Sequence, residues 1–107
     1  MRVSFSPQRR DGTIEVIKNG DKLRINGKLF SFVSLPDGAT IPAGNVPCEW
    51  ITGPVERING EIHLTLVLPH GPRPSQRVAF PTPLENPPDG QLDIPADPTL
   101  EVPNVDA

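Results

Sequence analysis

The side chains best suited to chemistry in this sequence are His63, His70, Glu56 and Cys48. A histidine beside a carboxylate can act as an acid–base pair, which His63 and Glu56 would form on neighbouring strands. Two histidines can also share a metal ion, but no Cys, Asp or Glu lies between His63 and His70 to complete such a site. A lone cysteine with no recognisable histidine partner is usually a small buried hydrophobe rather than a nucleophile.

Simpler structural roles explain each of these side chains. The alternating polarity of residues 61–68 makes His63 and Glu56 a cross-strand pair on the solvent face of a hairpin, and His70 follows that strand in a loop. The sequence has no glycine-rich phosphate loop, no Ser-His-Asp spacing and no informative pair of carboxylates. We therefore expect a protein that is not an enzyme and that uses no cofactor or metal ion.

The elements that carry these residues are predicted by three Asn-Gly pairs, which favour tight hairpins because a type I′ turn needs positive φ at both central residues. The pairs are Asn19-Gly20, Asn26-Gly27 and Asn59-Gly60. A two-residue turn at the first pair predicts three cross-strand contacts: Val16 with Leu23, Ile14 with Ile25, and Glu15 with Arg24. The second turn places Leu23 opposite Phe30 and adds Phe32 to the same apolar face, so residues 13–33 are predicted to form a three-stranded meander.

The third turn predicts the pairs Arg57 with Ile62, Glu56 with His63, and Val55 with Leu64. In the strand that follows, residues 61–68, every second side chain is apolar and faces one way: Ile62, Leu64, Leu66 and Leu68. Such a pattern is typical of a strand against the core. We expect a central strand, with Trp50 and Ile51 packed beside it.

Shorter elements complete the predicted domain. Arg2–Ser6 is expected to be an edge strand that stops at Pro7. Pro36-Asp37-Gly38 predicts a turn between the meander and the last hairpin, and residues 43–49 could form at most one helical turn. Several short strands joined by tight turns predict an all-β fold, either a small antiparallel β-sandwich or a partly open barrel built from hairpins.

Proline and charge divide the chain near residue 80. Residues 1–80 carry ten basic and seven acidic side chains, whereas residues 81–107 carry six acidic side chains, no basic one and seven of the 15 prolines. The second segment has little apolar surface to offset its ordering entropy, and its prolines favour an extended chain. We therefore predict a compact domain over residues 1–80 and an extended, acidic, proline-rich arm over residues 81–107, whose deletion would leave the domain's thermal unfolding nearly unchanged.

Basic side chains of the domain and apolar side chains of the arm are the candidate partner-binding residues. Arg9, Arg10, Arg73 and Arg77 could meet an acidic surface, such as the arm of a neighbouring copy, with simple solvated arginines as the plainer alternative. Nucleic acid is not an expected partner, because the net charge is −3 and only 5% of the residues are aromatic. The anchors predicted in the arm are Leu84, Leu92, Ile94, Leu100 and Val102.

The sequence shows neither a targeting or membrane-spanning segment nor the cysteines of a disulfide framework. It has no run of 18 or more apolar residues and no basic-then-apolar segment at its start, so we expect a soluble protein that is neither secreted nor inserted in a membrane. Its single cysteine excludes an internal disulfide framework.

Three stretches of the sequence resemble a known family: SPQRR at residues 6–10, INGKLFSF at residues 25–32 followed by LPDGA at residues 35–39, and GPVERINGEIHLTLVLPHGP at residues 53–72. They are similar to small proteins of tailed bacteriophages and prophages that are encoded among the tail, baseplate and tail-fibre genes. The likeness covers about residues 5–80 and is most specific over residues 53–72. Because the family carries no established catalytic motif, the resemblance implies a context and transfers no functional residue.

The resemblance implies a structural component of a phage tail tip, baseplate or fibre-attachment region, found in the virion tail and, during assembly, in the host cytoplasm. Its partners would be other tail, baseplate or fibre proteins, or copies of itself. An extended arm suits this role because it covers much surface per residue without a core of its own. The main alternative is a tail-fibre assembly factor or chaperone that is absent from the mature virion, and a small host-directed regulator is a third.

Overall fold

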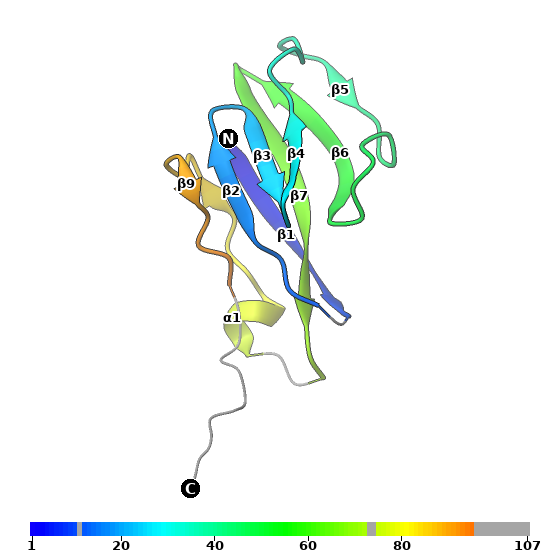
Figure 1. Ribbon diagram of the computed structural model, residues 1–107, viewed down its shortest axis with the longest axis vertical. Coiled ribbons are helices and arrows are strands. Elements are labelled where there is room, and N and C mark those ends of the chain that lie inside the picture. Colours follow the sequence, from blue (N-terminus) through cyan, green and yellow to red (C-terminus); the bar gives the residue numbers. More distant parts are fainter. Residues whose placement is uncertain (11, 73–74, 96–107) are drawn as a thin grey trace, which may run out of the picture.

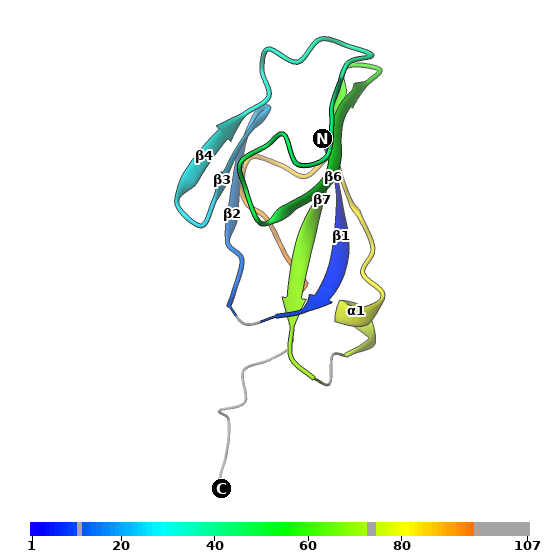
Figure 2. The same ribbon diagram turned by 90° about the vertical axis from the view of Figure 1, so that its right-hand side faces the viewer.

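Two β-sheets packed face to face make up the part of the chain that the computed structural model describes, residues 1–10, 12–72 and 75–95 (Figures 1 and 2). Its strands are β1 (Arg2–Arg9), β2 (Val16–Asn19), β3 (Lys22–Ile25), β4 (Lys28–Ser31), β5 (Thr40–Ile41), β6 (Ile51–Ile58), β7 (Glu61–His70), β8 (Leu84–Glu85) and β9 (Gly90–Gln91). One helical turn, α1 (Gln76–Ala79), is the only helix of the described residues. The turn that the sequence allowed at residues 43–49 does not form there.

The strand order is β5-β6-β7-β1-β8 in sheet 1 and β4-β3-β2-β9 in sheet 2. Neighbouring strands are antiparallel except β1 and β7, which run parallel. The two sheets remain separate, so the fold is an open β-sandwich and not a closed barrel. The predicted all-β, hairpin-built class is thereby confirmed. The parallel pair was not predicted, because its two strands are far apart in the sequence.

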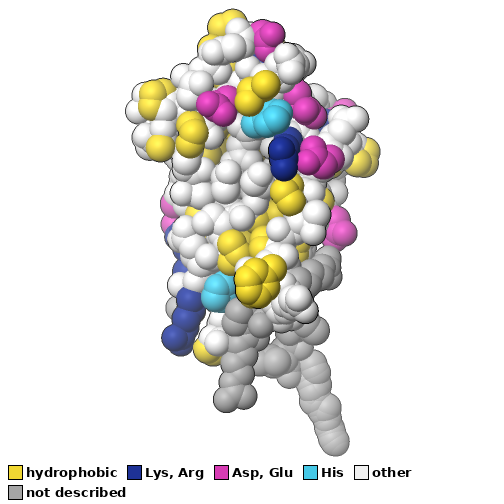
Figure 3. Space-filling model, turned by 180° about the vertical axis from the view of Figure 1, so that it is seen from behind, with side chains coloured by type: hydrophobic (Ala, Val, Ile, Leu, Met, Phe, Trp, Pro, Cys, Tyr) yellow, Lys and Arg dark blue, Asp and Glu magenta, His cyan; other side chains and the backbone are white. Residues whose placement is uncertain are grey.

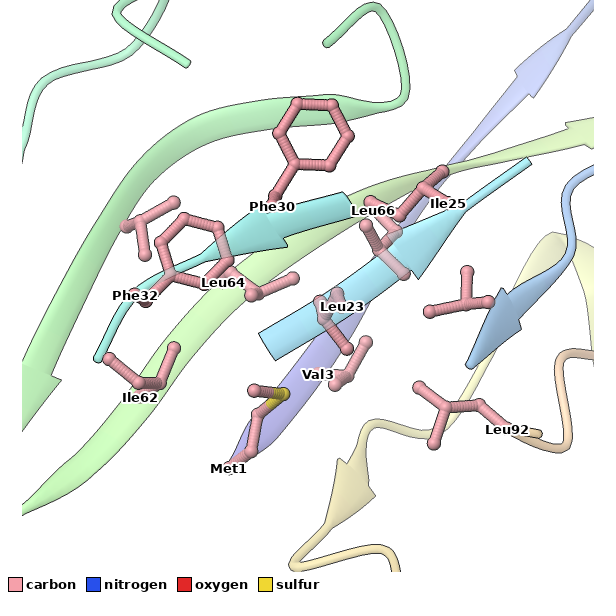
Figure 4. Close-up of a cluster of buried hydrophobic side chains, with 12 residues drawn as sticks. Met1, Val3, Leu23, Ile25, Phe30, Phe32, Ile62, Leu64, Leu66 and Leu92 are labelled. Atoms are coloured by element: carbon pink, nitrogen blue, oxygen red, sulfur yellow. The ribbon is translucent and has the colours of Figure 1, made fainter. Parts of the chain in front are cut away.

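β7 lies at the centre of sheet 1, as its alternation predicted. Its side chains Ile62, Leu64 and Leu66 are at most 3% exposed, and Ile51 of β6 pairs with Leu66 on the incoming side. The side chains that meet them between the sheets include Val3, Val16, Leu23, Ile25, Phe30, Phe32, Val55 and Leu92 (Figure 4). Both sheets therefore contribute to this cluster, and Val67, Leu68 and Val78 are buried outside it.

β1 is an inner strand and not the edge strand that was predicted, and it runs on through Pro7. β8 pairs only with the first two residues of β1, so the far side of β1 has no partner strand at the proline. The N–H of Arg10 donates to the carbonyl oxygen of His70, and strand amides alternate in direction, so the odd-numbered positions of β1 point away from β7. A proline at position 7 therefore removes no bond between the two strands, which explains why it does not end β1.

Two of the three predicted hairpin registers are confirmed. The observed pairs are Leu23 with Phe30 between β3 and β4, and Arg57 with Ile62 and Glu56 with His63 between β6 and β7. Asn26 and Asn59 take positive φ, as does the glycine after each, which is the geometry of a type I′ turn. The predicted pairing of Val55 with Leu64 is lost, because an irregularity between Thr52 and Glu56 shifts the register of β6.

The predicted register of the β2–β3 hairpin is wrong by two residues. Val16 pairs with Ile25 and not with Leu23. The central residues of this turn are Gly20 and Asp21, of which only the glycine has positive φ, and this pattern suits a type II′ turn. A shift of two residues leaves every side chain on its own face of the sheet, so the apolar pattern could not distinguish the two registers.

Residues 81–95 are packed on the domain, which corrects the boundary predicted at residue 80. β8 pairs with β1 at the edge of sheet 1, and β9 pairs with β2 at the edge of sheet 2, so this segment crosses between the sheets along one side of the sandwich. Leu92, predicted as a partner anchor, is 4% exposed in the core, and Leu84 and Ile94 pack against it. These leucines and the isoleucine occupy core surface that distant strands provide, a contribution that local composition cannot reveal. The rest of the predicted arm, residues 96–107, lies outside the described residues.

The substitution Leu92→Ala tests this packing. It is expected to lower the free energy of unfolding by about 2–4 kcal/mol, because it removes buried methyl groups and leaves a cavity. The matched control Leu29→Ala removes a side chain that is 52% exposed and should change stability by about 0.5 kcal/mol or less. Chemical denaturation measures both changes, and equal small losses would show that residues 84–94 do not pack on the core.

Candidate functional site

His63 and Glu56 face each other on β7 and β6, but each has another partner. Nε2 of His63 lies 3.5 Å from Oε1 of Glu61, whereas the hydroxyl of Thr40 donates to Glu56 at 3.3 Å. The N-terminal ammonium group donates to Glu61 at 3.1 Å and lowers the pKa of that carboxyl, and His63 lowers it further. A carboxylate with a lowered pKa is a weak general base, so this arrangement favours an ion pair over acid–base catalysis.

The other candidate groups for chemistry lie apart from one another. His70 is seven positions after His63 on the same strand, which corresponds to about 23 Å and to the opposite face of the sheet. Its Nδ1 lies 2.6 Å from the carbonyl oxygen of Gly71. Cys48 has a free thiol and packs half-buried against the core. The described residues contain no cluster of three side chains able to hold a metal ion.

The arginines predicted to bind partners have different environments. Arg10 forms an ion pair with Glu49 at 2.6 Å and lies 4.4 Å over the ring of Trp50, so it is used within the domain. Arg9 is exposed at the end of β1. Arg73 and the side chain of Arg77 lie outside the described part of the chain. Of these four arginines, the structure therefore describes only the side chains of Arg9 and Arg10.

Arg57 on β6 forms the densest polar network, which the sequence analysis missed. Its guanidinium donates to the carboxylate of Asp21 at 2.9 Å and to the carbonyl oxygens of Phe32 at 3.0 Å, Gly60 at 3.0 Å and Leu35. Only 12% of the Arg57 side chain is exposed. The network joins sheet 1 to the β2–β3 turn and to the segment that follows β4.

The sequence contained a pattern that predicts the buried position of Arg57. The predicted pairing of Arg57 with Ile62 already placed a guanidinium on the face that Ile62 buries. A buried charge needs a partner, and five N–H groups need acceptors. The position of Arg57 was therefore predictable, but three of its acceptors were not, because they come from the β2–β3 turn and the segment after β4, at residues 21, 32 and 35.

A small open notch lies beside Arg57, between residues 37–40 and residues 56–59. Its volume is about 220 Å³. The polar groups that line it already have partners: Asp37 accepts from the N–H of Gly60 at 2.9 Å, and Glu56 accepts from Thr40. The notch thus offers little to orient a small ligand.

On the other side of the sandwich, Asp89 connects the β8–β9 turn to sheet 2. It accepts hydrogen bonds from Nζ of Lys18 at 2.8 Å and from the N–H of Gly20 at 3.0 Å. Lys18 points to the core side of β2, where only 11% of its side chain is exposed, so the carboxylate compensates a largely desolvated charge. These contacts, led by the bond from Lys18, lower the pKa of Asp89 from its ordinary value of 3.8.

The best candidate interaction site is the outer face of sheet 2 together with the edge of β4. The β2, β3 and β4 strands lie nearest the viewer in Figure 1. Their outward side chains alternate with the buried ones, and they are apolar, basic or neutral polar: Ile17, Asn19, Lys22, Arg24, Leu29 and Ser31. Ile17 and Leu29 are 38% and 52% exposed on either side of Arg24. The opposite face of the molecule, shown in Figure 3, instead mixes acidic, basic, histidine and apolar side chains.

The edge of β4 carries unpaired backbone groups. β4 is the outermost strand of sheet 2, and its partner is β3 alone. Because the N–H of Phe32 donates to Asp21 and strand amides alternate, Phe30 and Lys28 also bond toward β3, while Leu29 and Ser31 direct their N–H and C=O groups outward. An exposed edge of this kind is a template for an added strand.

Comparison with known proteins adds no relative to these observations. No protein-family model matches the chain, and neither a curated protein nor a solved structure is significantly similar to it. Within the described residues, no helix has the length and apolar character needed to cross a bilayer.

The variants Arg57→Met and Arg57→Lys test the Arg57 network. Arg57→Met should lower the free energy of unfolding by about 2–4 kcal/mol, because it leaves buried carbonyl oxygens and Asp21 without their donor. Arg57→Lys keeps the charge but cannot reach all the acceptors, so its free energy of unfolding should fall by less than that of Arg57→Met. Arg24→Met, which removes an exposed guanidinium with one carbonyl contact at 3.3 Å, is the matched control and should be near neutral. Equal decreases in the free energy of unfolding for Arg57→Met and Arg24→Met would refute the stabilising role of the Arg57 network.

The pH dependence of stability tests Asp89. Its pKa is lowered on folding, so its contribution is fully present above the ordinary value of 3.8 and disappears as the pH falls through the lower folded value. The melting temperature of Asp89→Asn should therefore lie below that of the wild type at neutral pH, and the gap should narrow as the pH falls below 4. Glu85→Gln, which alters an exposed pair with Arg2, is the control. A gap that stays constant with pH would contradict this assignment.

Proposed function

We propose that this protein is a structural, non-catalytic component of a bacteriophage tail tip, baseplate or fibre-attachment region. The observation that carries the proposal is the resemblance of residues 53–72 to small proteins encoded among phage tail genes. In the structure these residues form the β6–β7 hairpin, which contains Arg57 and the central strand. The resemblance therefore covers the residues on which the architecture depends, and this supports a shared fold with that family.

The surface supports an assembly role in a second way. A small β-sandwich with an open strand edge and an apolar, basic face can bind neighbouring subunits by backbone pairing and by apolar contact. We propose that other tail, baseplate or fibre proteins are the partners and that the site of action is the virion tail.

Mass spectrometry of purified virions from a phage that encodes this chain tests the proposal. We expect the protein in the particle at a fixed ratio to a known tail protein, which is the internal control for particle recovery. Absence from the particle, together with abundance in infected-cell lysate bound to fibre protein, would refute the structural role and favour the assembly-factor alternative. Recovery with a host protein alone would favour a host-directed regulator.

A further inference from the structure

We propose that the edge of β4 binds residues 99–102 of a second copy of this chain as an added β-strand. This inference concerns self-association and does not rest on the phage context. It follows from three features of the chain: the unpaired backbone groups of β4, the sequence of the C-terminal segment and the distance that this segment can cover.

The acceptor is a short strand with a free edge. The outward N–H and C=O groups of Leu29 and Ser31 have no backbone partner among the described residues. Lys22 and Arg24 lie on the neighbouring strand, directly across from Ser31 and Leu29, and neither forms an ion pair within the described part of the chain. An incoming strand would thus meet open hydrogen-bonding groups flanked by two uncompensated positive charges.

The donor matches this acceptor in length and pattern. Thr99-Leu100-Glu101-Val102 is bounded by Pro98 and Pro103, so four residues are free of proline, and β4 itself is four residues long. In an extended strand Leu100 and Val102 point to one side and Glu101 to the other. Placing the two apolar side chains beside Phe30 on the core side directs Glu101 to the outer face, toward the side of Lys22 and Arg24. The opposite register would put the carboxylate against the core, so the charge selects one register.

The length of the chain selects a second copy as the donor. The described chain leaves sheet 2 after β9, which is the edge strand opposite β4. Crossing from β9 to a position beyond β4 covers four strand spacings, or about 19 Å. Residues 95 and 99 are four positions apart and can be separated by at most about 14 Å. Leu92 and Pro95 are buried, and Figures 1 and 2 show the described chain after β9 running toward α1, away from β4. The chain's own residues 99–102 therefore do not reach its own β4.

The charge balance of the whole chain agrees with this contact. Residues 96–107 carry Asp97, Glu101 and Asp106 and no basic residue, whereas the outward side chains of β2, β3 and β4 include Lys22 and Arg24 and no acidic one. Opposite charges on donor and acceptor favour the encounter and disfavour pairing between two β4 edges, which would bring like charges together. Contacts of this kind join different surfaces of the two copies, so they produce a reciprocal dimer, a ring or an open filament.

Sedimentation of the full-length chain over a concentration series tests the proposal. We expect self-association that weakens at least about tenfold in Leu100→Pro, because the substitution removes the leucine side chain that would pack beside Phe30 and fixes φ at about −65°, away from strand geometry. Val105→Pro carries the same change outside residues 99–102 and should associate like the wild type. The double charge reversal Lys22→Glu/Arg24→Glu should also weaken association, and adding Glu101→Lys to it should restore part of the loss. Thermal unfolding of each variant establishes that its domain is intact.

Mixing two defective chains gives a readout that misfolding cannot mimic. Leu100→Pro keeps an intact acceptor, and Lys22→Glu/Arg24→Glu keeps an intact donor. Neither should associate alone, but an equal mixture should form a heterodimer. A wild-type chain that stays monomeric at every concentration, equal behaviour of Leu100→Pro and Val105→Pro, or a mixture without heterodimer would each overturn the inference. None of these results bears on whether the protein is found in virions, so this proposal and the functional one fail separately.

Discussion

The guanidinium group of Arg57 holds the two sheets together along one side of the sandwich. The domain is small and only 36% of its sequence is hydrophobic, so the apolar core alone leaves the rims of the two sheets to be joined by polar contacts. A single planar group with five donors can bond several carbonyl oxygens and a carboxylate at once, which a lysine cannot do. Arg57 accordingly reaches the β2–β3 turn and the segment after β4 from its place on β6. The position of β4, and hence of the open edge, depends on this network.

The other side of the sandwich is closed by the chain segment that contains β8 and β9. This segment pairs with one edge of each sheet, and Asp89 at its turn compensates the largely buried charge of Lys18. With one side joined by Arg57 and the other by this segment, the two sheets are held at both rims. The outer surface of sheet 2 and the free edge of β4 remain available to partners. In a protein whose histidines, thiol and carboxylates lie apart, that surface is the feature best suited to function, and it suits assembly.

The fold brings together some of the opposite charges that lie far apart in the sequence. The division of the sequence near residue 80 suggested two independent pieces of opposite charge, a basic domain and an acidic arm. The structure instead adds residues 84–94 to the domain, because they supply a strand to each sheet and Leu92 to the core. Asp89, which the sequence analysis assigned to the acidic arm, forms an ion pair with Lys18 inside the domain. Among the described residues, Lys22 and Arg24 on the outer face of sheet 2 form no ion pair, whereas Arg10, one of the predicted partner-binding arginines, is paired with Glu49.

The sequence by itself determined the local elements: three hairpins, two of which turn at an Asn-Gly pair, the inward face of each strand and the central place of β7. These follow from φ preferences and from a two-residue period, both of which act over a few residues. It did not determine the β2–β3 register, because a shift of two residues preserves every face. Only the tertiary structure decided the parallel pairing of β1 with β7, the three distant acceptors of Arg57 and the docking of residues 84–94. Each of these joins residues distant in sequence, and each is stable only when surfaces from separate segments are already in contact. A proline-rich acidic stretch with scattered apolar residues therefore gives no local sign that it belongs to the core.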